Sequence, residues 1–210
     1  MFTGITQGLC TVMEIREEVS LRRITLNLEI LGEKPKLGAS VAVNGTCLTV
    51  TGVNGDNVSF DVIRESLETT NLGDLQVGSR VNVERSIKFG EEVGGHVLSG
   101  HISGLVHVVQ VVDDENERNI CFEVPKQWMK YLLHKGFVAL DGASLTIARV
   151  DFAAATITVS LIPETIKRTT LGSVIAGAGV NLEVDSQTQA VVDTVERIME
   201  SSDWQNRVGR

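Results

Sequence analysis

The sequence predicts an all-β protein in which two similar six-stranded barrels follow each other along the chain, with a single α-helix at the C-terminus. Three observations lead to this prediction. Short runs of β-branched and apolar residues alternate with Gly, Asn and Asp, which is typical of strands and tight turns. The order of motifs in the first half returns in the second half. Only the tail carries apolar residues at clear helical spacing.

The clearest strand patterns are bounded by turn residues. Asn54-Gly55-Asp56, between two such patterns, is a strong hairpin signal. The segments predicted as strands with most clarity are Ile24–Ile30, Thr46–Val53, Val58–Ile63, Arg80–Val83, Asn119–Val124, Leu145–Val150 and Thr156–Leu161. Because a closed barrel leaves no strand edge exposed, about six strands in each half favour closure.

Helical signals are few. Short helical turns are predicted in three places, Arg64–Leu72, Lys126–Leu133 and Pro163–Leu171. In the tail, Thr188, Val191, Val195 and Ile198 recur at intervals of three or four residues. So narrow a stripe is typical of a coiled-coil seam between chains, and a helix packed on its own domain is the alternative.

An internal repeat is the most informative feature of the chain. VAVNGTCLTVTGV (Val41–Val53) aligns with VALDGASLTIARV (Val138–Val150), and IRESLETTNLGDLQVGSRVNVE (Ile63–Glu84) aligns with IPETIKRTTLGSVIAGAGVNLE (Ile162–Glu183). The offset drifts only from about 96 to 99 residues, so the elements have the same order in both halves. The predicted organisation is a first barrel over residues 1–86, a linker over 87–95, a second barrel over 96–185 and a helix over 186–202.

Composition and charge exclude several classes of function. The 210 residues, 42% hydrophobic and 22% charged, are typical of a globular chain and not of a disordered one. A formal net charge of −8 argues against a nucleic-acid partner, which requires a basic surface. Three cysteines (Cys10, Cys47 and Cys121) without a CxxC pair favour neither a disulfide framework nor a zinc site. Without a signal-peptide pattern or a membrane-length apolar run, we expect a cytoplasmic protein with no membrane partner.

Matched polar pairs indicate a ligand-binding face in each half. Cys47 and Thr49 are two residues apart in a predicted strand, so their side chains share one face, and Ser144 and Thr146 are their counterparts. A single cysteine is more often a small buried apolar residue. The matching Ser/Thr pair in the other half makes a ligand face the preferred interpretation.

The segment GGHVLSGHIS (Gly94–Ser103) is the other candidate for chemistry. Its glycines allow a close approach to a flat ligand, and histidine exchanges protons near neutral pH. For His96, a structural and a functional role both stay open. We expect no metal site, because HExxH and a nearby cysteine pair are absent from the sequence. GxSxG and GxGxxG are absent as well, which argues against a serine hydrolase and a nucleotide-binding fold.

Together these motifs resemble those of riboflavin synthases. They are MFTG, NGTCLTV, ESLETTNLG, GGHVLSGHI, KGFVALDGASLT, LIPET with RTTLG, and TQAVVDTVERI, and the resemblance runs from Met1 to about Met199. It implies Greek-key barrels that each hold one molecule of 6,7-dimethyl-8-ribityllumazine, and a homotrimer gathered by the C-terminal helix. In this family the N-terminal barrel of one subunit pairs with the C-terminal barrel of its neighbour.

The resemblance also implies an activity. It is that of a transferase in riboflavin biosynthesis, which moves a four-carbon unit between two lumazines to give riboflavin and 5-amino-6-(D-ribitylamino)uracil without a cofactor. Lumazine synthase is a further partner that the resemblance leaves open. A non-catalytic lumazine- or flavin-binding antenna protein is the alternative, but such homologues tend to lose motif residues in one half, whereas both halves keep theirs here. A third reading is a β-barrel interaction module.

Site residues carried over by position fall into two pockets. The N-terminal pocket is expected to use Gly4, Ile5, Thr6, Cys47, Leu48, Thr49, Asp61, Val62, Ile63, Arg64, Glu65, Ser66, Gly100, His101 and Ile102. The C-terminal pocket is expected to use Lys135, Ser144, Leu145, Thr146, Ile162, Pro163, Glu164, Thr165, Ile166 and Lys167. Phe2 of the MFTG motif is expected to anchor the first strand.

The implied reaction begins with loss of a proton from the acidic 7α-methyl group of one lumazine, while the other lumazine takes up a nucleophile. His101 is the expected proton carrier, and Cys47, Ser144, Thr146 and Asp141 are candidates to activate or position the nucleophile. Holding two substrates in register makes a bimolecular event effectively intramolecular. We expect the differences between the halves to assign the donor and acceptor roles. These are Cys47 against Ser144, Ile5 against His101 and Asn44 against Asp141.

Overall fold

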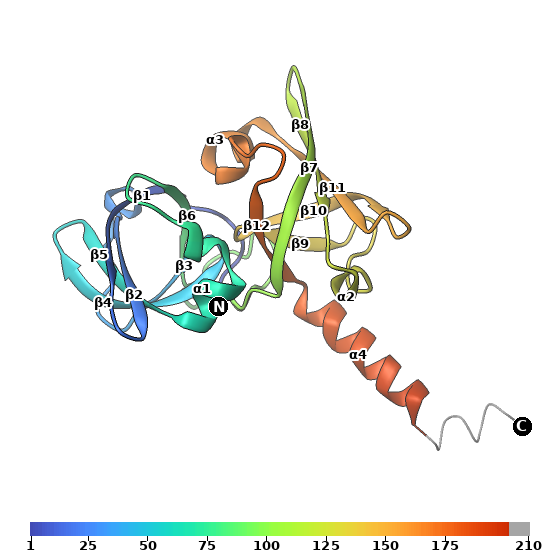
Figure 1. Cartoon of the computed structure of the whole chain (residues 1–210), viewed down its shortest axis with the longest axis horizontal. Helices are drawn as coiled ribbons and strands as arrows, with labels where there is room; N and C mark the ends of the chain where they lie inside the picture. Colours follow the sequence, from blue (N-terminus) through green and yellow to red (C-terminus); the bar gives the residue numbers. More distant parts are fainter. Residues whose placement is uncertain (202–210) are drawn as a thin grey trace, which may run out of the picture.

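The computed structural model describes residues 1–201 and contains two closed barrels of antiparallel strands followed by a helix (Figure 1). The first barrel consists of β1 (Gly8–Glu17), β2 (Leu21–Asn27), β3 (Ser40–Val43), β4 (Thr46–Asn54), β5 (Asn57–Ile63) and β6 (Arg80–Arg85). The second consists of β7 (Gly104–Asp114), β8 (Glu117–Glu123), β9 (Phe137–Leu140), β10 (Ala143–Asp151), β11 (Thr156–Leu161) and β12 (Gly179–Val184). The predicted fold class is therefore confirmed.

The two barrels have the same topology. Around the first, the paired strands follow the order β1-β2-β5-β4-β3-β6, and around the second the equivalent order β7-β8-β11-β10-β9-β12. The pairing of β2 with β5, past β3 and β4, makes a Greek-key connection. β-Bulges occur at equivalent places, between Val12 and Glu14 in β1 and between Val108 and Gln110 in β7. Such bulges bend a sheet and help it to close.

Each barrel has its own apolar core, which is filled by every second residue of its strands. Phe60 and Ile24 are fully buried in the first barrel, and Phe122 and Ile120 in the second. The hairpin predicted at Asn54-Gly55-Asp56 joins β4 and β5, with Gly55 at a φ of +62°. The register of the strands follows from this alternation, because a slip by one residue would turn the apolar side chains outward.

Short helices connect the strands. They are α1 (Arg64–Thr69), α2 (Lys126–Met129) and α3 (Pro163–Arg168), with 3₁₀ turns at Glu29–Leu31, Asn71–Asp74 and Thr170–Gly172. The helical segments predicted as Arg64–Leu72 and Pro163–Leu171 are each divided in two, because Thr70 and Thr169 are extended. α2 ends before the predicted Leu133.

Most of the predicted strands differ from the observed ones by one or two residues at an end, and one strand differs more. Ile24–Ile30 was expected to be continuous, but β2 begins at Leu21 and ends at Asn27. The side chain of Asn27 accepts a hydrogen bond from the Glu29 N–H (3.1 Å), and residues Glu29–Leu31 then turn as a 3₁₀ helix. This local side-chain bond therefore favours a turn over the continuation of the strand.

Helix α4 (Ser186–Glu200) extends away from both barrels (Figure 1). Asp185 caps it by accepting a hydrogen bond from the Thr188 N–H (2.9 Å). The stripe residues Val191, Val195 and Ile198 are exposed, so the helix does not bury this stripe on its own domain. Residue 202, the last residue of the predicted helix, lies outside the described residues.

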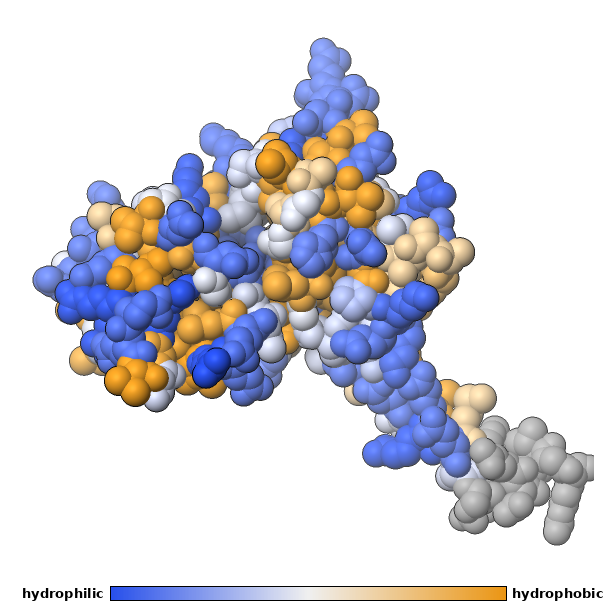
Figure 2. Space-filling model, viewed as in Figure 1, coloured by the Kyte–Doolittle hydropathy of each residue, from blue (hydrophilic) through white to orange (hydrophobic). Residues whose placement is uncertain are grey.

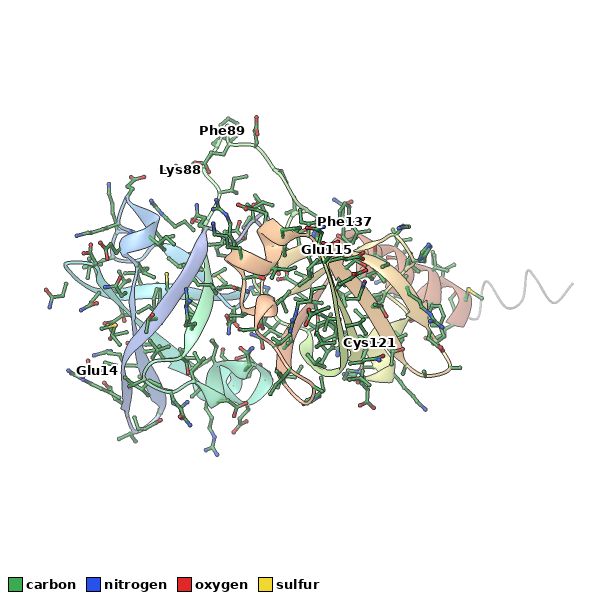
Figure 3. The ribbon with its side chains drawn as sticks, turned by 90° about the horizontal axis from the view of Figure 1, so that it is seen from above. Glu14, Lys88, Phe89, Glu115, Cys121 and Phe137 are labelled. Atoms are coloured by element: carbon green, nitrogen blue, oxygen red, sulfur yellow. The ribbon has the colours of Figure 1, made fainter. Side chains whose placement is uncertain are left out.

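Three further features concern the surface, the linker and the helices. Figure 2 shows a largely hydrophilic face of α4 and mixed hydrophobic patches over the barrels. Between the barrels, the chain over residues 87–95 loops outward, with Lys88 and Phe89 at its outer end (Figure 3). Among the described residues, none of the helices is long and apolar enough to cross a membrane.

Candidate active site

Two segments outside the barrels pair with each other between them. We call residues 1–6 the N-terminal crossing segment and residues 96–102 the central crossing segment. Phe2 N–H donates to the Leu98 carbonyl (2.9 Å), Leu98 N–H donates to the Phe2 carbonyl (3.0 Å), and His96 N–H donates to the Thr3 carbonyl (3.1 Å). Phe2 and Leu98 are buried against Ala42 of the first barrel and Ala139 of the second. The expected anchoring role of Phe2 thus has a geometric basis between the barrels.

Each crossing segment contacts the polar residue that the repeat singled out. The Gly4 carbonyl accepts a hydrogen bond from the Ser144 N–H (2.9 Å), and the Gly100 carbonyl accepts one from the Cys47 N–H (2.8 Å). Both glycines have a positive φ, +77° and +81°. A Cβ on Gly4 would lie 2.5 Å from Ser144 Cβ, and a Cβ on Gly100 would lie 2.5 Å from Cys47 Cβ. At each position glycine is therefore required for two reasons: the backbone conformation excludes other residues, and there is no space for a Cβ.

One predicted grouping differs from the placement of its residues. Gly4, Ile5 and Thr6 are predicted for the N-terminal pocket, and in the structure they line a cavity of about 150 Å³ on the C-terminal barrel, beside Ser144. The remaining lining residues of this cavity are Ala143, Glu164, Thr165, Arg168 and Thr169. The repeat tells which residues correspond between halves, but it does not tell against which barrel a free segment packs. Gly100, by contrast, lies against Cys47 of the N-terminal barrel, as expected.

Ser144 has a histidine partner that the sequence left undecided. His96 Nδ1 and Ser144 Oγ share a hydrogen bond of 2.6 Å. The His96 ring stacks on Phe137 (centroids 5.0 Å apart) and is 7% exposed. Burial lowers the pKa of His96, which favours the neutral imidazole. Its Nε2 atom is buried without a hydrogen-bond partner among the described residues. His96 therefore fixes the Ser144 hydroxyl without bringing a positive charge to the site.

The N-terminal barrel site is arranged around Cys47. Thr49 shares its strand face and is exposed, and His101 follows Gly100 on the central crossing segment with an exposed side chain. At the end of β5, Asp61 accepts two hydrogen bonds from Arg23 (2.6 and 2.9 Å), which hold the pKa of Asp61 below its usual range. Asp61 is thus a fixed carboxylate at the border of this site.

The predicted site residues on the strand ends and short helices divide into two groups. Ile63, Arg64, Glu65, Ile162, Pro163, Glu164 and Lys167 are exposed, and Ser66, Ile102 and Thr165 are half-buried. Leu48, Val62 and Leu145 are buried in the barrel cores, and Ile166 packs against the core of the second barrel. These last four residues therefore offer a ligand little more than their backbone.

Two further residues predicted for the C-terminal pocket, Thr146 and Lys135, lie in different places relative to the cavity. Thr146 is exposed on the same strand face as Ser144. Lys135 has a φ of +63° in the turn before β9, and its N–H donates to the Ile147 carbonyl (2.9 Å). It does not line the cavity beside Ser144. Arg168, which is not among the predicted site residues, does line this cavity and forms an ion pair with Glu164.

Asp141 lies in a polar network between the barrels and not in the cavity. Its carboxylate accepts hydrogen bonds from the Asn181 N–H (2.9 Å), the Asn71 amide (2.8 Å) and the Thr170 hydroxyl (3.0 Å). Its own carbonyl accepts one from the Asn82 amide (2.8 Å). Burial raises the pKa of Asp141 to about 6. These contacts give Asp141 a structural role in joining the barrels, and its handling of a nucleophile stays a prediction.

Comparisons with known proteins agree with this architecture. The lumazine binding domain family matches residues 3–86 and 99–185. Riboflavin synthase of Escherichia coli (strain K12) is 51% identical over 201 residues, which are 95% of this chain and 93% of the relative. Riboflavin synthase of Chlamydia pneumoniae is 41% identical over 203 residues, 96% of this chain and 98% of the relative.

Solved structures show the same fold. LumP complexed with 6,7-dimethyl-8-(1'-D-ribityl) lumazine has a TM-score of 0.79 and 28% identity, covering 89% of this chain and 100% of that chain. LumP complexed with riboflavin has a TM-score of 0.81 and 29% identity over the same shares. With both barrels matched by the domain family and a riboflavin synthase 51% identical over 95% of this chain, the chain belongs to the riboflavin synthase family and is built from two lumazine binding domains.

Proposed function

We propose that the chain converts two molecules of 6,7-dimethyl-8-ribityllumazine into riboflavin and 5-amino-6-(D-ribitylamino)uracil. The observation that carries this proposal is the duplicated site, in which a crossing-segment glycine lies against Cys47 in one half and against Ser144 in the other. Donor and acceptor are the same compound, so two sites of one design suit the reaction. The products together contain the atoms of two substrates, so no oxidant, reductant or other co-reactant is required.

Each lumazine has its own set of residues in this proposal. At the N-terminal barrel, the lumazine binds among Cys47–Thr49, Asp61–Ser66 and residues 100–102. At the C-terminal barrel, it binds among residues 4–6, 144–146 and 162–167. The glycines let the flat ring approach the backbone, and the hydroxyl and backbone groups orient it. Much of the rate acceleration comes from holding the two rings in register.

The two sites differ in the group that exchanges a proton. His101 follows the glycine at the N-terminal barrel site, whereas Ile5 follows the glycine at the other site. We assign to His101 the removal of the 7α-methyl proton from the lumazine bound at the N-terminal barrel. Ser144, held by a neutral His96, orients the lumazine at the C-terminal barrel. This division gives identical substrates different roles.

A homotrimer completes the proposal. The exposed stripe of Val191, Val195 and Ile198 on α4 requires an apolar partner, and the same stripe of other copies is the simplest one. Pairing the N-terminal barrel of one copy with the C-terminal barrel of the next brings one site of each kind together. Such pairing supplies the two adjacent lumazines that the reaction needs.

The test is a mixture of the purified chain with 6,7-dimethyl-8-ribityllumazine and no cofactor. We expect flavin absorbance to grow while two lumazines are consumed for each riboflavin formed. Stable binding without turnover would identify a lumazine-binding protein of the antenna kind and contradict the proposal. Absence of binding would indicate an interaction module.

A further inference from the structure

Two buried glutamates at equivalent positions hold the crossing segments. Glu84 on β6 accepts hydrogen bonds from the Thr3 N–H (2.6 Å), the Thr3 hydroxyl (2.9 Å) and the Gly4 N–H (3.0 Å). Glu183 on β12 accepts hydrogen bonds from the Ser99 N–H and hydroxyl (both 2.8 Å) and from the Gly100 N–H (3.2 Å). The two glutamates end the matching segments RVNVE and GVNLE of the repeat.

Each glutamate acts on the residue after the glycine through a hydroxyl group. The Ser99 hydroxyl, which donates to Glu183, accepts a hydrogen bond from the His101 N–H (3.1 Å). The Thr3 hydroxyl, which donates to Glu84, accepts one from the Ile5 N–H (3.4 Å). A hydroxyl that donates to a carboxylate is fixed in direction, and its lone pairs then fix the next backbone N–H.

We call each glutamate together with the hydroxyl residue that it fixes a bracket: Glu84 with Thr3, and Glu183 with Ser99. Each bracket connects the two barrels. Glu84 belongs to the first barrel, but the segment that it holds reaches Ser144 of the second barrel. Glu183 belongs to the second barrel, and the segment that it holds reaches Cys47 of the first. Each barrel therefore determines where the other barrel's site-completing segment lies.

Strand pairing places each glutamate in line with the site residue of its own barrel. Ala42 lies opposite both Glu84 and Cys47, on its two sides. In the second barrel, Ala139 lies in the same way between Glu183 and Ser144. Residues directly opposite each other in neighbouring strands share one face of the sheet. The glutamate, the alanine and the site residue therefore form one short row under the two crossing segments.

We propose that Glu183 and Ser99 are positioning residues that place His101 for proton removal at the N-terminal barrel site, and that Glu84 and Thr3 place Ile5 at the other site. This inference rests on the proposed function, in which His101 carries the proton. Only the Glu183–Ser99 bracket ends on a titratable side chain. The two brackets are alike in geometry but differ in consequence: loss of the first affects the chemical step, and loss of the second affects substrate binding.

The test uses the hydroxyl groups, because removing a buried glutamate risks the fold. Ser99→Ala is compared with Ser99→Thr, which keeps the hydroxyl and copies the other half, and the matched pair is Thr3→Val with Thr3→Ser. We expect Ser99→Ala to lower kcat by about ten-fold or more at little change in KM, and Ser99→Thr to restore kcat. Thr3→Val is expected to raise KM more than it lowers kcat. Equal effects of Ser99→Ala and Ser99→Thr would overturn the proposal.

A double-variant cycle separates this inference from the proposed function. If Ser99 acts through His101, Ser99→Ala added to His101→Gln lowers kcat no further than His101→Gln alone. Fully additive losses would overturn the positioning role while leaving the function intact. Absence of turnover by the unchanged chain would instead contradict the function itself. Thermal unfolding of each variant, with midpoints close to that of the unchanged chain, shows that kcat reports the site and not the fold.

Discussion

His101 is the residue that most clearly separates the two sites. Its exposed imidazole stands where the other half has the aliphatic side chain of Ile5, and a hydrogen-bonded backbone N–H fixes its place. The other histidine of the GGHVLSGHIS segment, His96, is buried, neutral and bonded to Ser144. Two histidines five residues apart thus have opposite environments, one buried against Phe137 and one exposed beside the site.

Replacing His101 by Gln tests its role. The amide keeps polarity and approximate size but cannot take up a proton. We expect kcat to fall by about 10²–10⁴-fold, the usual contribution of a general base, with a smaller change in KM. Steady-state riboflavin formation is the measurement. His107→Gln, at an exposed position of β7, is the matched control and should keep its rate. An unchanged kcat in His101→Gln would exclude it as the base.

Asp141 is a second residue whose environment leads to a measurable effect. Burial raises its pKa from 3.8 to about 6 in the folded chain. Between these values the native state binds more protons than the unfolded state. The stability contribution of the protonated group is therefore complete below about pH 4 and is lost as the pH rises through about 6.

Asp141→Asn should remove this dependence, because an amide stays neutral and Asn44 holds the equivalent position in the other half. Relative to the unchanged chain, the free energy of unfolding of the variant should rise by up to about 3 kcal/mol between about pH 4 and pH 7. Urea unfolding of both chains at a series of pH values measures the difference. A difference that is constant with pH would contradict the assignment.

At the scale of elements, α4 has an apolar stripe that no other part of the described chain covers. Lys130 and Tyr131 hold it through Asp193 and Glu196, and Val192 packs against the second barrel. Its stripe residues remain exposed. A helix that is attached by one side and apolar on another is suited to association with further copies.

The double substitution Val191→Asp/Val195→Asp should dissociate the proposed trimer. Burying two carboxylates in an apolar seam costs more than the association provides. Sedimentation should give a trimer for the unchanged chain and monomers for the variant, with loss of riboflavin formation. Arg197→Ala, on the opposite side of the helix, is the control. A variant that stays trimeric would contradict the role of α4.

At the scale of the whole molecule, the two barrels meet at a close backbone contact. A Cβ on Gly142 would lie 2.7 Å from Gly45 N and Cα, and both glycines have a positive φ. Around this contact, Asn82 and Asn181 bond the carbonyls of Asp141 and Asn44 across the junction (2.8 Å each). The relative placement of the barrels, and with it that of the crossing segments, depends on this contact.

Gly142→Ala tests the contact, with Gly55→Ala as a matched control. Gly55 also has a positive φ (+62°), but a Cβ there meets nothing within 4 Å. The control should lose only about 1–2 kcal/mol of stability, which is the cost of the left-handed conformation for a residue with a Cβ. Gly142→Ala should lose more stability and also lower kcat, because it pushes the barrels apart. Thermal unfolding and riboflavin formation measure both effects. Equal losses in the two variants would show that the contact does not matter.

The sequence by itself determined the strands, the repeat and the two-barrel fold. Alternation within a strand and turn residues between strands depend on near neighbours, so local reading finds them, as for β11 at its predicted bounds Thr156–Leu161. The strand pattern failed where a side chain stabilised a turn, as Asn27 does at the end of β2. The matching of Cys47 with Ser144 also came from sequence alone.

Only the tertiary structure decided how the site is assembled. Gly4 and Ser144 are far apart in the chain, and no periodicity connects them, so the contact of Gly4 with Ser144 could not be predicted from the sequence. The partnership of His96 with Ser144 and the place of Asp141 between the barrels depend likewise on how two folded units dock. Docking depends on the shape complementarity of the two folded barrels and on the hydrogen bonds between them. The residue pattern of a single strand contains no information about either.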